Sequence, residues 1–435
     1  MSRAAAGQWT IVLFCLLFVP ALRAQEAARP LTLKQALASL EANHPDLQMA
    51  LAERDSAEAE REIAASRLDG SVNFEGILRS GVQSISPYDI APDNSVRLTA
   101  RKTLYDFGRT SAAEQAAVSE LKAREAELVT VKERHRLEVM SRFFDVLLAD
   151  MQYNADNELM AVVYVAFDQG KDNLAAGKIS SVELSELESH YRDTLLKRTA
   201  SEQRQRITRA LLANAMNRPG DLPGDLEDPG LAGNNRVLPD YDALLPVLWA
   251  NNPHLIAQRE RLAASQQRLE SLRAEKGPLL DAEVQTADYS RNAITRDNLS
   301  AGLILSWPLY QGNRADSRVA KELAQYNWLQ AGTEKLKMDL TQAVLETYLD
   351  IVQMQSAGRA AGRKQVEYRD MVLERSRGLY EMELKSNLGT SMTDTAEAHL
   401  GVRKTEYRLA LDFARLEAML GKPLEGKDID AKPAK

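Results

Sequence analysis

The sequence predicts a mainly α-helical chain that also carries the strands of a membrane β-barrel and is written as two copies of one repeat. Three observations predict this fold class: motifs that recur at nearly one spacing, two very long segments with helical periodicity, and four short segments in which apolar and polar residues alternate. The composition agrees, because a chain with 27% charged and only 6% aromatic residues favours long helices over sheets.

Residues 1–24 have the pattern of a secretory leader. Arg3 gives it a positive start, Ile11 to Val19 form an unbroken apolar run, and Ala24 offers a small residue for cleavage. So short a run cannot span a membrane as a helix, which takes about 20 residues. The one cysteine, Cys15, lies in this segment, so we expect the exported chain to hold no disulfide and no thiolate metal site.

Motifs recur in the same order in the two halves of the chain. The spacing is 208 residues for the first motif and 205 for the others, and the glycines at 177 and 389 sit at comparable polar breaks. This predicts a first repeat over 25–216, a Pro- and Gly-rich linker over 217–240, a second repeat over 241–421 and a polar tail over 422–435. The matches are Asn43–Leu47 with Asn251–Leu255, Leu104–Arg109 with Leu309–Arg314, Val139 with Val344, and Asp145 with Asp350.

Each repeat begins with a short helix and a longer one. In the first repeat, a capping-box pattern from Thr32 to Gln35 starts the short helix and Pro45 ends it. In the second, Pro246 is expected to interrupt the corresponding helix.

Very long helices are expected over 109–176 and 313–385, with return helices over 180–215 and 392–420. Each long helix would measure roughly 100 Å at about 1.5 Å per residue. That exceeds the width of a globular domain, so these helices must pack side by side along their length. Heptad spacing supports this packing. The stripes are Leu137, Met140, Phe144, Leu147 and Met151, and Met338, Thr341, Leu345, Tyr348 and Val352.

Two hairpins are expected over 71–104 and 279–309, with outside turns over 84–94 and 290–298. Each strand runs about 10 residues, the length of a tilted membrane strand. The alternation alone also fits a small soluble sheet. However, hairpins flanked by helices of roughly 100 Å leave no soluble core to cover an apolar face.

The number of strands predicts a trimer. Four strands cannot close a barrel, since the smallest membrane barrels have about eight, and an open edge in lipid leaves backbone groups unpaired. Two chains would give a lumen filled by side chains, whereas three chains give twelve strands and room for passage.

Enzyme, cofactor and nucleic-acid signatures are missing from the sequence. There is no phosphate-binding loop, dinucleotide fingerprint, zinc-protease motif or serine-hydrolase elbow. The five histidines are scattered, and we expect His135 and His190 on helix surfaces. No basic stripe points to nucleic acid. We therefore expect no catalysis, no cofactor and no bound metal. The alternative is a soluble periplasmic coiled-coil scaffold, which would share the leader and heptads but would not need paired alternating strands.

Together, these motifs resemble the TolC family of outer-membrane efflux proteins, from Leu31 to about Leu420. The resemblance implies a homotrimer with a twelve-stranded β-barrel in outer-membrane lipid and a twelve-helix α-barrel in the periplasm. It implies an exit duct for efflux or type I secretion, working with a periplasmic adaptor and an inner-membrane transporter. Residues at the strand–helix junctions would have a structural role. They are Tyr105, Gly108, Arg109, Tyr310, Gly312 and Arg314.

The same resemblance implies a charged ring at the periplasmic end, because family members carry acidic side chains just after the turn there. Here Glu183 and Glu186 follow the first turn, and Asp394 and Glu397 follow the second, although the stretch 380–389 is longer than in the family. Such a ring filters ions; the alternative is that these acids only favour a helix start. The adaptor-docking tips would be Gly177-Lys178 and Gly389-Thr390.

Overall fold

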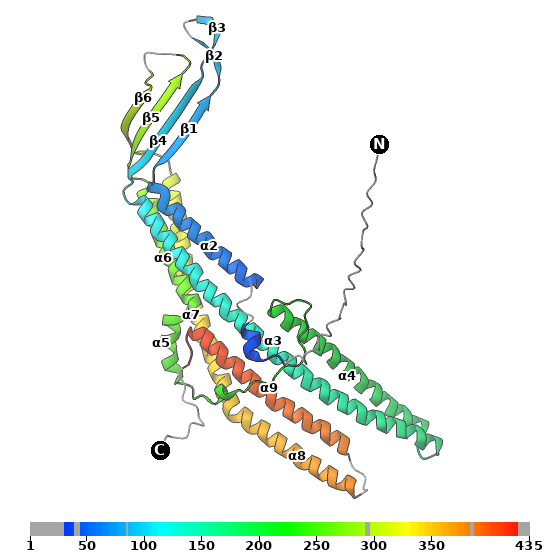
Figure 1. The fold of residues 1–435 in the computed structure, drawn as a ribbon. Helices are drawn as coiled ribbons and strands as arrows, with labels where there is room; N and C mark the ends of the chain where they lie inside the picture. Colours follow the sequence, from blue (N-terminus) through cyan, green and yellow to red (C-terminus); the bar gives the residue numbers. More distant parts are fainter. Residues whose placement is uncertain (1–29, 39–43, 84–85, 292–295, 383–386, 425–435) are drawn as a thin grey trace, which may run out of the picture.

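The computed structural model describes residues 30–38, 44–83, 86–291, 296–382 and 387–424. The expected leader and most of the expected tail lie outside these residues. Figure 1 shows an elongated chain with strands at one end and two pairs of long helices at the other. No described helix is both long enough and apolar enough to cross a membrane.

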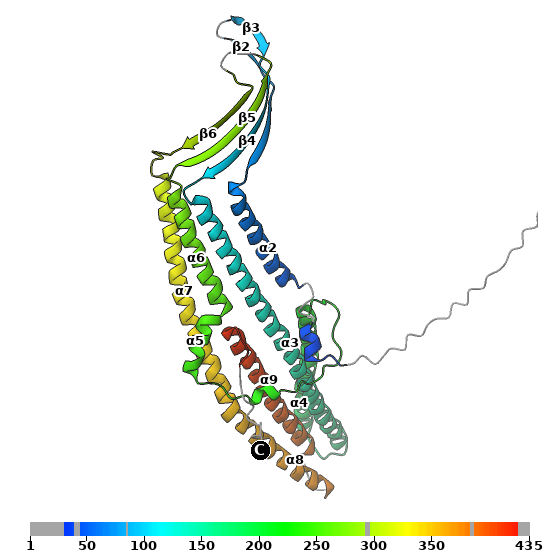
Figure 2. The same ribbon diagram turned by 60° about the vertical axis from the view of Figure 1, so that its left-hand side comes forward.

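Four strands form one antiparallel sheet in the order β1-β4-β5-β6, so the hairpins of the two repeats pair with each other through β4 and β5. In Figure 2 these strands curve together above the helices. Their bounds are Ser71–Ile77 for β1, Ser95–Tyr105 for β4, Leu279–Tyr289 for β5 and Leu299–Ser306 for β6.

The turn expected over 84–94 was wrong. Strand β3, Ser86–Pro92, occupies most of it and pairs with β2, Ser80–Gln83, as a separate two-stranded sheet. The polar composition of this segment favoured a loop, but pairing such as Val82 with Ile90 satisfies the backbone as a ladder. The first hairpin therefore extends beyond the main sheet (Figure 1).

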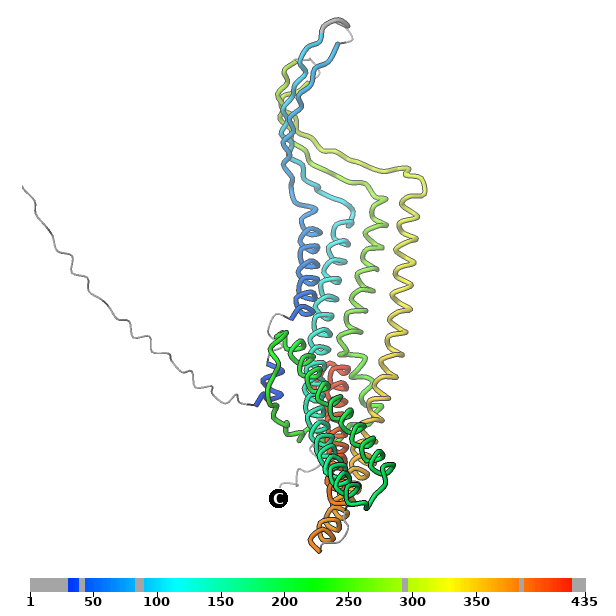
Figure 3. Tube along the Cα trace, turned by 90° about the vertical axis from the view of Figure 1, so that its right-hand side faces the viewer, coloured from blue at the N-terminus to red at the C-terminus, as the bar shows by residue number. Residues whose placement is uncertain are grey.

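The helices follow the order expected for two repeats. In Figure 3, α2, α3, α6 and α7 run side by side below the sheet. Farther down, α4 continues the line of α2 beside α3, and α9 continues the line of α6 (Figure 1). The first repeat holds α1 Leu33–Ala38, α2 Pro45–Ala65, α3 Arg109–Ala175 and α4 Ser181–Ala215. The second holds α5 Tyr241–Asn251, α6 Pro253–Ala274, α7 Arg314–Gln353, α8 Arg359–Glu381 and α9 Leu388–Leu420.

Two helix predictions in the second repeat need correction. Helix α5 continues through Pro246, because buried Leu244 and Leu248 hold both of its halves against α7 and α9. The helix expected over 313–385 is divided by a π-helical turn, Met354–Gly358, and α8 ends at Glu381. The π-turn lies where Gln355 donates to the carbonyls of Asn234 and Arg236 in the linker, both at 2.9 Å.

The second tip also differs from the expectation. Helix α9 begins at Leu388, not 392, so Gly389 and Thr390 lie in its first turn. A Cβ placed on Gly389 would come within 2.3 Å of Val162 Cγ2 on α3. The glycine therefore permits close helix packing here and does not form a turn.

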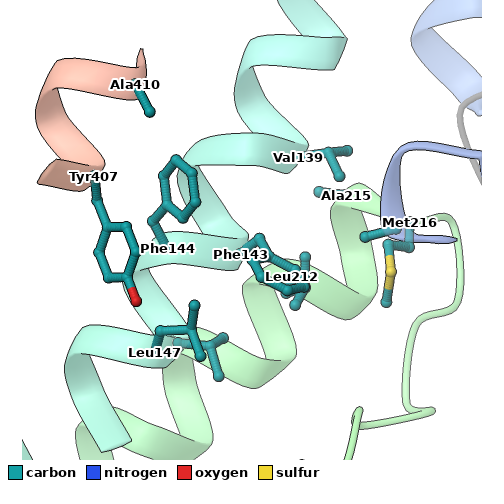
Figure 4. Close-up of a cluster of buried hydrophobic side chains, with 11 residues drawn as sticks. Val139, Phe143, Phe144, Leu147, Leu212, Ala215, Met216, Tyr407 and Ala410 are labelled. Carbon is teal, nitrogen blue, oxygen red and sulfur yellow. The ribbon is translucent and has the colours of Figure 1, made fainter. Parts of the chain in front are cut away.

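Two buried cores lie at mid-length, one built mainly by helices of the first repeat and one by helices of the second. In the first, Phe143 and Phe144 of α3 meet Leu212 of α4 and Tyr407 of α9 (Figure 4). The rings of Phe144 and Tyr407 stack with centroids 4.6 Å apart. The second core joins α5, α7 and α9 through Leu248, Ile351, Phe413 and Leu416, among others. Val139 and Val344, matched by the sequence repeat, are both fully buried, one in each core.

Candidate functional site

Most charged residues of the sheet share one face. Glu75 lies opposite Arg97, Arg101 opposite Glu283, and Thr103 opposite Asp281. Cross-strand neighbours project from the same side of a sheet. Arg97 pairs with Glu75 at 3.4 Å, Arg101 Nε donates to Glu283 at 2.8 Å, and the Thr103 hydroxyl donates to Asp281 at 2.7 Å. This face carries paired charges suited to water.

The opposite face of the sheet is mainly apolar and uncovered, although Lys102, Thr286 and Asp288 also lie on it. One row across it is Val72, Ala100, Val284 and Ala301. Val72 is 68% exposed, and Phe74, Leu303 and Leu305 are similarly open. Among the described residues, β1 and β6 have no partner on their outer edges. A sheet with one apolar face and two open edges is incomplete as a single chain.

The strand–helix junction of the first repeat is built by the motif Leu104–Arg109. Phe107 and Gly108 both take left-handed backbone conformations, with φ of 55° and 87°. Buried Asp106 then accepts hydrogen bonds from the amides of Gly108 and Thr110, at 3.2 and 2.7 Å, and so caps the start of α3. The chain thereby passes from β4 into α3 within three residues.

Charged side chains fix this junction to the second repeat. Arg109 reaches Glu275 at 3.4 Å, and Arg318 reaches the same carboxylate at 2.9 Å. In the second junction Gly312 has a φ of 61°, and Tyr310 is 91% exposed. Arg314 begins α7. An exposed aromatic ring beside an apolar strand face is typical of a membrane interface.

The first tip turns at Gly177, which has a φ of 68°. The amide of Lys178 donates to the Asn173 carbonyl at 2.8 Å, which completes a Schellman motif. Glu183 forms a capping box with Ser180, and its carboxylate accepts a hydrogen bond from the Ser180 amide at 2.7 Å. That backbone hydrogen bond, and then the bond from the Ser180 hydroxyl, hold the pKa of Glu183 below its usual range. Glu186 is exposed one turn farther on.

The acidic pair of the second tip is divided between two environments. Asp394 of α9 forms an ion pair with Arg369 of α8 at 2.6 Å, whereas Glu397 is exposed. The ion pair of Arg369 with Asp394 was not predicted from the sequence, because the spacing of the two residues in the chain gives no sign that their helices bring them into contact.

His135 was expected on a helix surface, and this expectation was wrong. Its side chain is 3% exposed and contacts His44, with ring centroids 3.9 Å apart and the rings tilted by 36°. His190 is exposed, as expected. Within the described residues, no group of three His, Cys, Asp or Glu side chains could hold a metal ion.

A sheet with a charged and an apolar face, carried on helices far longer than a globular core requires, defines a subunit of a membrane channel with a helical extension. Residues 36–218 and 244–421 match the family of outer membrane efflux proteins, and the chain belongs to that family. It is thus an outer-membrane efflux channel subunit whose helices extend into the periplasm.

Solved structures share its fold at low sequence identity. VceC from Vibrio cholerae has a TM-score of 0.72 at 16% identity, covering 90% of this chain and 97% of that one. CmeC from Campylobacter jejuni has a TM-score of 0.74 at 12% identity, with 89% and 85% covered. The open state of MtrE from Neisseria gonorrhoeae has a TM-score of 0.70 at 14% identity, with 92% and 90% covered. No curated protein sequence matches the chain.

Proposed function

We propose that three copies of the chain join their sheets, edge to edge, into a twelve-stranded barrel that serves as an exit duct through the outer membrane. The observation that carries this proposal is the open sheet with unlike faces. Its apolar side fits lipid, its paired charges fit a water-filled lumen, and the edges of β1 and β6 need partners in lipid. Pairing β6 of one copy with β1 of the next meets all three needs.

The helices support the same assembly. Each chain contributes four helical columns: α2 above α4, α3, α6 above α9, and α7 followed by α8 (Figure 1). Three chains would set twelve columns around one axis. A soluble coiled-coil scaffold would also use such columns, but it would gain nothing from uncovered apolar residues such as Phe74 and Leu303.

We further propose that the duct works with a periplasmic adaptor and an inner-membrane transporter, and that the adaptor docks at the helix tips. Gly177 and Lys178 form the exposed first tip, and Thr390 is exposed at the start of α9. Gly389 lies against Val162 and would support this surface from behind.

The narrow end is proposed to filter ions through Asp394 and Glu397, with Glu183 and Glu186 as the acids of the first tip. Three copies would place carboxylates around one axis, which attracts cations. At the first tip, Glu183 already caps α4. At the second tip, Asp394 already pairs with Arg369, so the exposed Glu397 is the freer of the two acids there.

Single-channel recording in planar bilayers tests both the duct and the filter. Wild-type protein should conduct ions and be blocked by divalent cations. Combining Asp394→Asn with Glu397→Gln should weaken the block, whereas Glu367→Gln, an exposed α8 acid paired with Lys364, should not. Absence of conductance in wild type would contradict the duct; unchanged block in the double variant would contradict only the filter.

A further inference from the structure

Two helix joins occupy equivalent places in the two repeats. At the first join α4 ends where α2 begins, and at the second α9 ends where α6 begins (Figures 1 and 3). The sequence repeat matches His44 with Asn252 at the start of the upper helix, and each of the two is followed by proline at the first helical position. On the long helix beside each join, it matches His135 with Leu340.

At the second join, one neutral residue connects the two helices. The Oδ1 atom of Asn252 accepts the amide of Leu255 at 2.9 Å, which caps α6. Its Nδ2 atom donates to the carbonyl of Met419, at the end of α9, at 2.8 Å. Leu340 is partly buried in the adjoining core. No group in these contacts changes its charge between neutral and mildly acidic pH.

At the first join, two imidazoles connect the helices in place of the single neutral residue. His44 Nδ1 accepts the amide of Asp46 at 3.3 Å and caps α2. Its ring lies against that of buried His135, with centroids 3.9 Å apart, and His135 forms a hydrogen bond with the backbone of Ala215 in the last turn of α4. An imidazole nitrogen accepts a hydrogen bond only while it is unprotonated. The cap on α2 therefore exists only when His44 Nδ1 carries no proton.

We propose that the first join is an acid-sensitive connection that loosens when His44 and His135 take up protons, while the second join stays intact. Two imidazolium rings with centroids 3.9 Å apart repel each other. Protonated His44 would turn from the Asp46 amide to the Asp46 carboxylate, now 4.0 Å away, and the start of α2 would lose its cap. The helices of each subunit would then respond to acid at the first join and not at the second.

The charges around the pair decide the direction of the effect. Asp46 of α2 and Glu138 of α3 favour protonation, with Glu138 4.0 Å from His135 Nδ1, an atom that has no hydrogen-bond partner. Burial, and then the charge of His44, outweigh them and hold the pKa of His135 below its ordinary 6.5. Because the folded state binds fewer protons than the unfolded state, stability at this join falls as the pH drops through about 6.5.

Hydrogen exchange of the detergent-solubilised full-length protein at about pH 7.5 and pH 5 tests the proposal, with rates corrected for intrinsic exchange. We expect protection in residues 45–49 and 212–216 to fall about fivefold or more in acid, as for a lost helix cap. Protection in residues 253–257, at the second join, should stay unchanged. An equal loss at both joins, or no loss at either, would overturn the proposal.

Variants that copy the second join into the first supply the matched control. His44→Asn combined with His135→Leu should abolish the pH dependence of residues 45–49 and leave protection at neutral pH unchanged. His44→Asn alone, which keeps a good cap and removes the contact between the two imidazoles, should act in the same direction even if the double variant folds poorly. A pH response that persists in His44→Asn would refute the role of the histidines, whether or not the protein conducts.

Discussion

At the residue scale, glycines have two different structural roles in this chain. Gly108, Gly177 and Gly312 supply left-handed backbone at junctions and at one tip, where side chains are strained. Gly389 instead lies inside α9 and admits Val162 of α3. The two roles predict different responses to substitution, because the first depends on the conformational freedom of the backbone and the second on the room left for a neighbouring side chain.

Gly389→Ala should destabilise the periplasmic end by about 1–3 kcal/mol, since its Cβ would overlap Val162 and overpack the α3–α9 seam. The midpoint of thermal unfolding in detergent would measure this. Gly401→Ala is the control in the same helix: nothing lies within 4 Å of its Cβ, so it should be neutral or mildly stabilising. Adding Val162→Ala should restore most of the loss in Gly389→Ala. If Gly389→Ala behaves like Gly401→Ala, the seam is not tightly packed there.

Local residue chemistry was predictable from the sequence where it depends on neighbours in the chain. The capping box at Thr32 and Gln35 forms, with bonds of 3.0 and 3.1 Å. The contacts of Arg369 with Asp394 and of His44 with His135 were not predictable in this way, because they join helices that are distant in sequence. The sequence repeat already matches His44 with Asn252, but only the fold shows that both are helix caps.

At the element scale, the linker fastens the π-turn to α9. Arg359, just after the turn, binds Glu406 of α9 through two hydrogen bonds of 2.7 and 2.8 Å. Asn234 of the linker donates to the same carboxylate at 2.8 Å. Burial alone would raise the pKa of Glu406, but the bonds from Arg359 and Asn234 outweigh it and hold this pKa below its ordinary value.

Glu406→Gln should lower the free energy of unfolding by about 1–3 kcal/mol at neutral pH, because Arg359 and Asn234 lose their charged acceptor. The contribution of a carboxylate with a lowered pKa is complete above its unfolded value and is lost as the pH falls through the folded one. The wild-type advantage should therefore begin to shrink as the pH falls below about 4.5 and be lost as the pH falls through the lower pKa of the folded carboxyl. Thermal melts from pH 7 to about pH 3 measure it, with Glu367→Gln at an exposed pair as control. A constant difference across this range would contradict the assignment.

Element types were more predictable than their interruptions. The long helix of the first repeat, expected over 109–176, is α3 at Arg109–Ala175, because it contains no proline and keeps one periodicity. The π-turn at Met354–Gly358 inserts a residue where the sequence has no proline, and its one glycine, Gly358, does not by itself predict the interruption. Strand β3 was missed for the opposite reason, since its polar residues resemble a loop although its backbone is paired.

At the scale of the whole molecule, duplication was the most informative feature of the sequence. Two repeats with the same order of elements predicted two hairpins and long helices packed side by side, and family membership confirms the outer-membrane efflux fold. The faces of the sheet then point to assembly. Among the described residues, a single chain leaves an apolar face and two edges uncovered, which supports the proposal that its stability in lipid depends on copies of itself.

The mass of the purified protein in detergent, measured by native mass spectrometry, tests this most directly. Sheets that close across subunits require a complex of three chains, which should persist when detergent is diluted to the lowest level that keeps the protein in solution. A protein that remains a single chain, and stays dissolved with no detergent at all, would contradict the edge-to-edge barrel.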